Sequence, residues 1–133
     1  MALFLRPLTL IFGTAEALPE GLLSRYPELR RARVRRGGLP PRIGGWCLGY
    51  SSVAGVTLGR TIWLGRKVRP SAELLLHEIR HVHQFEAVPG FPFRYVWESL
   101  RRGYHHNRFE VDARQFAFER TRGRGEDPLS EGA

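Results

Sequence analysis

The stretch PSAELLLHEIRHVHQFEAV at residues 70–88 has the pattern of a helix with one buried face. Its apolar residues recur three and four positions apart, at Leu74, Leu75, Ile79, Val82 and Phe85. This spacing places them along one side of an α-helix. Ser71 is a favourable N-cap, and Pro89-Gly90 ends the pattern. The sequence therefore predicts a packed helix from Ser71 to about Val88.

Within this helix, residues 77–81 read His-Glu-Ile-Arg-His. Residues four positions apart project from one helical face, so His77 and His81 are placed to bind one zinc ion. Glu78 lies beside that face and could take a proton from a water whose pKa the metal lowers to about 7. This is the sequence pattern of zinc metallopeptidases. The competing interpretation, two ordinary polar positions on an amphipathic helix, is less favoured because the surrounding face is packed.

A catalytic zinc site needs a third protein ligand and an open position for water. The downstream candidates are Glu86, Glu98, His105, His106, Glu110, Asp112 and Glu119. Glu110 lies in one helical row with Ala113 and Ala117, whose small side chains allow a close approach to the helix at 71–88. Glu110 is therefore the predicted third ligand.

Gln84 and Asp112 are candidates for contacts behind the metal ligands. Gln84 continues the row of His77 and His81, and its amide could hydrogen-bond a ligand or act as polar filler, with equal weight on each. Asp112 lies about 200° around the helix from Glu110, so both carboxylates cannot face one metal. Asp112 belongs to a polar stripe that also contains Arg108, Gln115 and Glu119. From this stripe Asp112 could still orient a histidine.

Tyr104, His105 and His106 stand directly before Asn107, the expected N-cap of a helix over residues 108–121. One of the three could stabilise an oxyanion at a substrate carbonyl. For the two histidines, a place in a polar loop is the preferred interpretation. The role of Tyr104 is open between the same two alternatives.

HEIRHVHQ at 77–84, together with NRFEVDAR at 107–114, resembles the gluzincin metallopeptidases. It is most similar to the minimal, single-domain bacterial group in which HExxHxxQ is followed by an Asn-x-x-Glu-x-x-Ala helix. AGVTLGRTIWLG at 54–65 also resembles the strand that precedes the active-site helix of that group. Many relatives have proline after the asparagine of the second motif, where this chain has Arg108. The resemblance covers roughly residues 50–120.

The resemblance implies zinc ligands at His77, His81 and Glu110, with Glu78 as the general base. It also implies that the strand near residues 61–64 lines the cleft and pairs with an extended peptide.

The rest of the chain is patterned as strands first and helices afterwards. Strands are expected over 31–36, at a sheet edge, and over 56–58 and 61–64; helical turns are expected over 15–30, and helices over 92–102 and 108–121. This order argues for an α+β fold. The resemblance implies a zincin-like arrangement, with a small, twisted, mainly antiparallel sheet over the HExxH helix and two further helices after it.

At 133 residues the chain has the length of one domain, expected over residues 1–122, with a disordered tail at 123–133. The apolar N-terminus, MALFLRPLTLIFG, is expected to be a strand or a packed arm. Arg6 and Pro7 interrupt it, and a membrane span needs about 20 apolar residues. With no clear signal peptide, a cytoplasmic location is favoured over secretion, and export by another route stays open.

The net charge is +8, and arginine supplies twenty of the twenty-one basic residues. Such a surplus suits nucleic acid, an anionic membrane surface or an acidic substrate. Because the basic residues are scattered along the chain, nucleic acid is the less favoured partner. Cys47 is the only cysteine, which excludes an internal disulfide and a cysteine-ligated zinc.

These observations predict a zinc-dependent metallopeptidase that hydrolyses peptide or protein substrates, with Zn²⁺ as cofactor and Glu78 as general base. One alternative is a latent or inactive zincin-like binding module. The other is a basic, nucleic-acid-associated protease similar to SprT-like domains, which use a third histidine as ligand. The sequence carries no signal for the oligomeric state.

Overall fold

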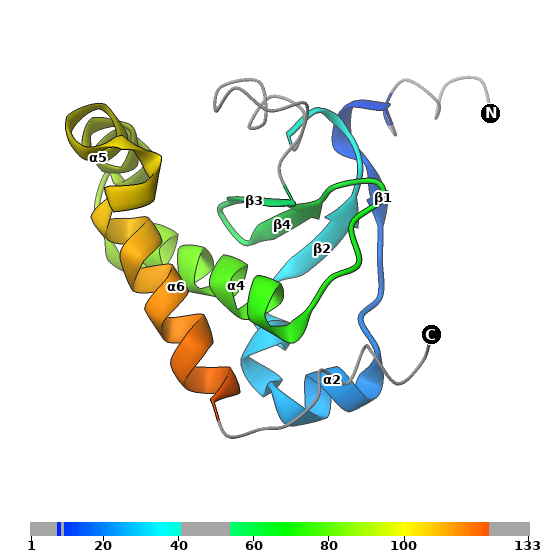
Figure 1. The fold of residues 1–133 in the computed structure, drawn as a ribbon. Coiled ribbons are helices and arrows are strands. Elements are labelled where there is room, and N and C mark those ends of the chain that lie inside the picture. The colour runs from blue at the N-terminus through cyan, green and yellow to red at the C-terminus, as the bar shows by residue number, and fades with distance from the viewer. Residues whose placement is uncertain (1–7, 9, 41–53, 123–133) are drawn as a thin grey trace.

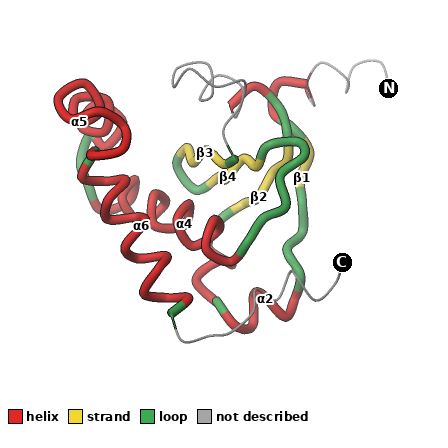
Figure 2. Tube along the Cα trace, viewed as in Figure 1, coloured by secondary structure: helices red, strands yellow, loops and turns green. Residues whose placement is uncertain are grey.

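The computed structural model describes residues 8, 10–40 and 54–122, and every structural statement refers to this part of the chain. The strands are β1 (Thr14–Ala15), β2 (Arg33–Arg36), β3 (Gly55–Leu58) and β4 (Thr61–Leu64). The helices are α2 (Glu20–Arg25), the 3₁₀ helix η1 (Pro27–Arg31), α4 (Ala72–Ala87), α5 (Phe91–His106) and α6 (Arg108–Thr121). The sheet lies on one side, α4 runs beside it, α6 packs on α4, and α5 forms an outer corner (Figures 1 and 2).

Several elements lie where the sequence predicts them. α4 begins after Ser71, whose hydroxyl accepts a 3.0 Å hydrogen bond from the first turn. α6 begins after the Asn107 cap. β3 and β4 occupy the two predicted strands, and the turn between them contains Gly59 at φ +62°, a left-handed conformation that favours glycine. The expected α+β fold is confirmed, although α2 and η1 lie between β1 and β2 and interrupt the predicted order of strands before helices.

The sheet is mixed, with the strand order β1-β2-β4-β3. β1 pairs with β2 and β3 pairs with β4 in antiparallel fashion, but the central β2–β4 pair is parallel. The β3–β4 hairpin places β4 rather than β3 against β2, and this choice makes the central pair parallel. The expected sheet is mainly antiparallel, but the observed sheet is mixed, because its central β2–β4 pair is parallel.

The strand predicted over residues 31–36 is present as β2, but its predicted place at a sheet edge is wrong, because β1 pairs with the outer side of β2. Two arginines of this strand, Arg35 and Arg36, have partners within the protein. Arg36 holds the Glu16 carboxylate at 2.9 Å and donates to the carbonyls of Gly65 and Val68 at 3.0 and 2.6 Å. These contacts satisfy the guanidinium group of a strand inside the sheet.

The N-terminal segment is helical at Leu8 and residues 10–12, in place of the strand considered for it. It is attached to the sheet through the carbonyl oxygen of Phe12. That oxygen accepts hydrogen bonds from Arg35 Nε at 2.6 Å and from Trp63 Nε1 at 2.9 Å. Its apolar side chains are 42% to 61% exposed, so the expectation of a packed arm is wrong as well; the exposed residues are Leu8, Leu10, Ile11 and Phe12.

The hydrophobic core lies between the sheet, the α2–η1 segment and the inner face of α4. Its fully buried side chains include Leu22, Tyr26, Leu29, Ile62, Leu64, Leu75, Leu76, Ile79 and Val82. Ala117 of α6 joins the same cluster. The core therefore fixes α4 between the sheet and α6, and α4 carries both motif histidines.

α5 and α6 are connected through Asn107, which is fully buried. Its side-chain oxygen accepts from the Phe109 amide at 2.9 Å, and its amide group donates to the Tyr95 carbonyl and Ser99 hydroxyl at 3.0 and 2.8 Å. The first helical run of α5 ends at Gly103, as predicted, because this residue takes a non-helical conformation at φ +78°; a further helical turn up to His106 follows it. This connection sets the position of the first turn of α6.

Among the described residues, no helix is long and apolar enough to cross a membrane. The predicted disordered tail at 123–133 and Cys47 lie outside the described residues.

Candidate metal centre

Three side chains from α4 and α6 converge on one point: His77, His81 and Glu110. His77 Nε2 lies 2.9 Å from Glu110 Oε2, and His81 Nε2 lies 3.1 Å from Glu110 Oε1. The two histidine Nε2 atoms are 3.2 Å apart. These residues form a group that could hold a metal ion.

The helices make this convergence possible. His77 and His81 are one turn apart on α4, with their rings edge to face at a centroid distance of 4.9 Å. On α6, Ala113 and Ala117 follow Glu110 along the buried side, with 0% and 1% of their surface exposed. Small side chains at the α4–α6 contact let the helix axes approach closely, so the Glu110 carboxylate reaches both imidazoles.

The spacing of the three groups suits zinc. A tetrahedral zinc ion with ligands at 2.0–2.1 Å separates its ligand atoms by about 3.3 Å. The separations of 2.9 to 3.2 Å are slightly shorter, as expected for groups held together by hydrogen bonds. Imidazole nitrogens and one carboxylate are also a ligand set that catalytic zinc uses. The residues therefore fit a divalent metal ion.

Gln84 fixes which nitrogen of His81 is available to a metal. The Gln84 amide nitrogen donates to two oxygen atoms, the Phe109 carbonyl at 3.0 Å and Asp112 Oδ2 at 2.9 Å. Its oxygen must then be the group that lies 2.8 Å from His81 Nδ1, and it accepts the Nδ1 proton. Neutral His81 consequently presents the lone pair of Nε2 toward Glu110 and His77, as a metal ligand requires.

The electrostatics of the cluster favour a cation. Burial alone would lower the pKa of His81, but the hydrogen bond that Glu110 accepts from it and the charges of Glu78 and Glu110 raise it to about 9. Burial likewise opposes ionisation of Glu110, yet hydrogen bonds from both histidines hold the pKa of its carboxyl well below the ordinary value. The field that attracts a proton here also attracts a metal ion, and the two compete for the same lone pairs.

Glu78 is 5% exposed and is held by β3. The Thr57 hydroxyl donates to Glu78 Oε2 at 2.6 Å, and the same hydroxyl lies 3.2 Å from the Glu78 carbonyl. Gly55 leaves room for the carboxylate, because a Cβ at this position would lie 3.1 Å from Glu78 Oε1. No sequence pattern points to Thr57 or Gly55, since their roles arise only when β3 packs on α4.

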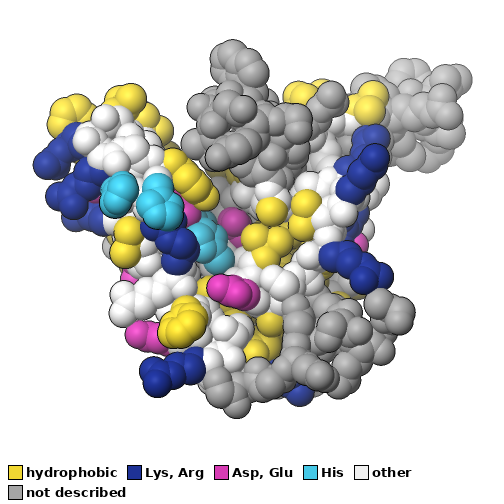
Figure 3. Space-filling view, viewed as in Figure 1, with side chains coloured by type: hydrophobic (Ala, Val, Ile, Leu, Met, Phe, Trp, Pro, Cys, Tyr) yellow, Lys and Arg dark blue, Asp and Glu magenta, His cyan; other side chains and the backbone are white. Residues whose placement is uncertain are grey.

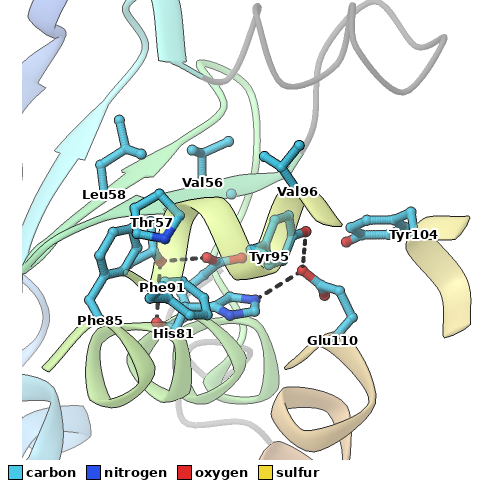
Figure 4. Close-up of a pocket in the computed structure, with 13 residues that line it drawn as sticks. Val56, Thr57, Leu58, His81, Phe85, Phe91, Tyr95, Val96, Tyr104 and Glu110 are labelled. Carbon is cyan, nitrogen blue, oxygen red and sulfur yellow. Dashed lines mark hydrogen bonds and ion pairs between the residues drawn. The ribbon is translucent and has the colours of Figure 1, made fainter. Parts of the chain in front are cut away.

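Tyr95 of α5 is a further contact that the sequence did not single out. Its hydroxyl donates to Glu110 Oε1 at 2.6 Å, and its ring lies edge to face with His81 at 6.1 Å (Figure 4). This bond occupies one oxygen of Glu110 and helps to orient the other. Burial, followed by the charge and hydrogen bond of Glu110, raises the pKa of the Tyr95 hydroxyl, so Tyr95 stays a neutral donor.

A cavity of about 310 Å³ opens beside the cluster, and Glu78, His81 and Glu110 line it. Its other walls are mostly apolar and come from β3, α4 and α5: Gly55, Val56, Thr57, Leu58, Phe85, Phe91, Pro92, Tyr95, Val96 and Tyr104. Figure 4 shows His81 and Glu110 at the floor, with Val56, Leu58 and Val96 above them. A largely apolar cavity with a few convergent polar groups is typical of a ligand site.

Of the remaining predicted residues, one lines the cavity and three do not. Tyr104 lines the cavity. His105 and His106 are exposed, pack edge to face on each other at 5.2 Å and do not line the cavity. Asp112 points away from the cluster, toward Arg80 Nε at 2.8 Å, and reaches His81 only through Gln84.

The strand beside the cavity is β3, not the 61–64 strand that the resemblance implied. β4 at 61–64 pairs with β2 on one side and β3 on the other, so neither of its sides is available to a peptide. β3 is the last strand of the sheet and contributes four cavity residues. The sequence could not distinguish these strands, because both read as short apolar runs.

No protein-family model, curated protein or solved structure matches this chain. The chemistry of the site therefore has to be inferred from its own residues.

Proposed function

We propose that this chain is a zinc-dependent peptidase. The observation that carries the proposal is the convergence of His77, His81 and Glu110 at the wall of a cavity that also contains the Glu78 carboxylate. A metal-binding group, a separate carboxylate and an apolar substrate cavity are the parts that metal-assisted hydrolysis requires.

In this proposal His77, His81 and Glu110 hold the metal, and Glu78 moves the proton. Zinc, when bound, supplies Lewis-acid polarisation and lowers the pKa of water to about 7. Glu78 takes the proton from the attacking water as its oxygen adds to the peptide carbonyl carbon. Glu78 then gives this proton to the amine nitrogen as the C–N bond breaks. The Thr57 hydrogen bond keeps the carboxylate in one orientation for both transfers.

The cavity and its edge strand favour an extended peptide with a large apolar side chain. Val56, Phe85, Phe91 and Val96 give the cavity an apolar wall. Among the described residues β3 pairs with β4 alone, and an extended segment can pair with the other side of such a strand. A peptide paired there would run past Glu78, which Thr57 of the same strand contacts.

The test is the substitution Glu78→Gln, which removes the base but none of the three metal-binding groups. We expect unchanged zinc content and a loss of at least ~100-fold in hydrolysis of a peptide library rich in apolar residues. Glu73→Gln is the matched control, since it changes an exposed glutamate of the same helix and should leave both measurements unchanged.

Two results would contradict the proposal. Equal hydrolysis by the Glu78→Gln and unmodified proteins would remove Glu78 from the reaction. A zinc-loaded protein that cleaves no peptide in the library would support the alternative of a zincin-like binding module.

A further inference from the structure

α5 presents an apolar ridge to solvent, formed by Phe93, Val96, Trp97 and Leu100. Their exposed fractions are 84%, 56%, 60% and 78%. The spacing of three, four and seven residues places all four side chains within about 100° of the helix surface. Exposed apolar clusters of this kind mark interaction sites more often than isolated exposed residues do.

The charges around the ridge have one sign. Arg94 and Arg101 follow Phe93 and Leu100 in the sequence, so both lie along the same side of the ridge. The single carboxylate of α5, Glu98, is 5% exposed. It is shared among the arginines at 101, 102 and 108, at 3.6 to 3.9 Å. The exposed surface of α5 is therefore apolar with a cationic flank.

We propose that this ridge docks α5 on the surface of an anionic lipid bilayer. Helices that lie in a membrane interface combine phenylalanine, tryptophan and leucine on one face with lysine or arginine on the other. The net charge of +8 adds long-range attraction to anionic lipid. Bilayer insertion also suits the shape, because α5 forms an outer corner of the molecule (Figure 1) rather than the floor of a groove.

The surface view agrees with this arrangement. Figure 3 shows hydrophobic side chains gathered over the outer end of the molecule at α5, with lysine or arginine side chains directly beside them. The apolar side chains reach the tip of the corner, so they can meet a flat surface without rearrangement of the helix.

The ridge also borders the cavity of the candidate metal centre. Val96 belongs to both, and Pro92, one residue before Phe93, lines the cavity as well. Docking through α5 would place the cavity close to the lipid surface, where apolar peptide segments accumulate. The docking itself does not depend on the proposed peptidase activity, and its test uses no enzymatic readout.

The test is co-sedimentation of the full chain with vesicles of phosphatidylcholine alone or mixed with phosphatidylglycerol. We expect binding to the anionic vesicles and much weaker binding to the neutral ones. Phe93→Ser should weaken binding to anionic vesicles about tenfold, because it removes one buried ring. Phe118→Ser is the matched control, since it removes a 60% exposed ring from α6 and should change nothing.

A second variant, Arg94→Gln/Arg101→Gln, tests the charge separately and should weaken binding to anionic vesicles by about tenfold or more. Circular dichroism and zinc content establish that each variant is folded. The proposal is overturned if the unmodified protein fails to bind anionic vesicles, or if Phe93→Ser binds them as well as Phe118→Ser. A concentration-dependent dimer that Phe93→Ser abolishes would also overturn it, because a second copy of the chain would then cover the ridge.

Discussion

Glu110 and Asp112 lie two positions apart on α6 and have different partners. Glu110 is 3% exposed and contacts both histidines and Tyr95. The Asp112 side chain is 44% exposed and forms a bidentate ion pair with Arg80, whose Nε and Nη2 atoms lie 2.8 and 3.3 Å from the two carboxylate oxygens. Asp112 is linked to the cluster only through Gln84.

Neutralising these two carboxylates should therefore have unequal effects. We expect Glu110→Gln to weaken zinc binding by much more than ~100-fold, because it removes a ligand. Asp112→Asn should weaken zinc binding by at most about 10–100-fold, as is typical of a residue that orients a metal ligand through a hydrogen bond. Competition with a chromogenic chelator measures both affinities. Loss of zinc from Asp112→Asn together with full retention by Glu110→Gln would show that the assignment of the third ligand is wrong.

Sequence patterns predict residues whose role follows from helical spacing. His77, His81 and Glu110 belong to this class, since the positions on α4 and the alanine row on α6 indicate which faces meet. Thr57 and Tyr95 do not belong to this class, because they reach the site from β3 and α5 rather than from α4 or α6. Their hydrogen bonds to Glu78 and Glu110 depend on how β3 and α5 pack, which no local period encodes.

At the scale of elements, an ion pair joins η1 to the end of α6. Arg120 donates to both oxygens of Glu28, at 2.6 and 3.0 Å, and its guanidinium lies over the Tyr26 ring at 5.2 Å. Burial would raise the pKa of Glu28, but the hydrogen bonds and charge of Arg120 lower it below the ordinary value. The pair connects residues 92 positions apart and holds the C-terminal end of α6 against the α2–η1 segment.

The contribution of this pair should depend on pH. Because the pKa of Glu28 is lower in the folded than in the unfolded state, its stabilisation is complete above about pH 4.3, the unfolded value, and is lost as the pH falls through the folded-state pKa. Glu28→Gln should lower the free energy of unfolding by ~1 kcal/mol at pH 7. The difference from the unmodified protein should shrink as acid protonates Glu28.

Urea unfolding at pH 7 and at acidic pH measures this difference. Glu20→Gln is the matched control, because it breaks the exposed pair between Glu20 and Arg30 and should change stability little. A Glu28→Gln effect that stays constant with pH, or a Glu20→Gln effect of equal size, would contradict the role given to the Glu28–Arg120 pair.

The elements themselves were more predictable than their neighbours in space. α4, α6, β3 and β4 follow from capping residues, turn residues and apolar spacing. The place of β2 inside the sheet does not follow from such local patterns, because the partners of Arg36 come from residues 16 and 65–68. The predicted helix end at Gly103 is confirmed, since this glycine takes a non-helical conformation, but the short helical turn that follows it up to His106 has no signal in the sequence pattern.

At the scale of the molecule, two features lie next to each other. The candidate metal centre sits between α4 and α6, and the apolar ridge of α5 borders the cavity beside it. The motif at 77–81 pointed to the first feature from the sequence alone. The ridge cannot be predicted from the sequence, because its spacing equals that of a buried helical face and only the fold shows that this face is exposed.

The central claim is the metal site, and the most direct measurement is anomalous diffraction at the zinc edge from crystals grown without added zinc. We expect one zinc peak, bonded to the Nε2 atoms of His77 and His81 and to a carboxylate oxygen of Glu110, with a position left open for water. A peak with other protein ligands, or a well-ordered cluster that contains no metal even after zinc is added, would contradict it.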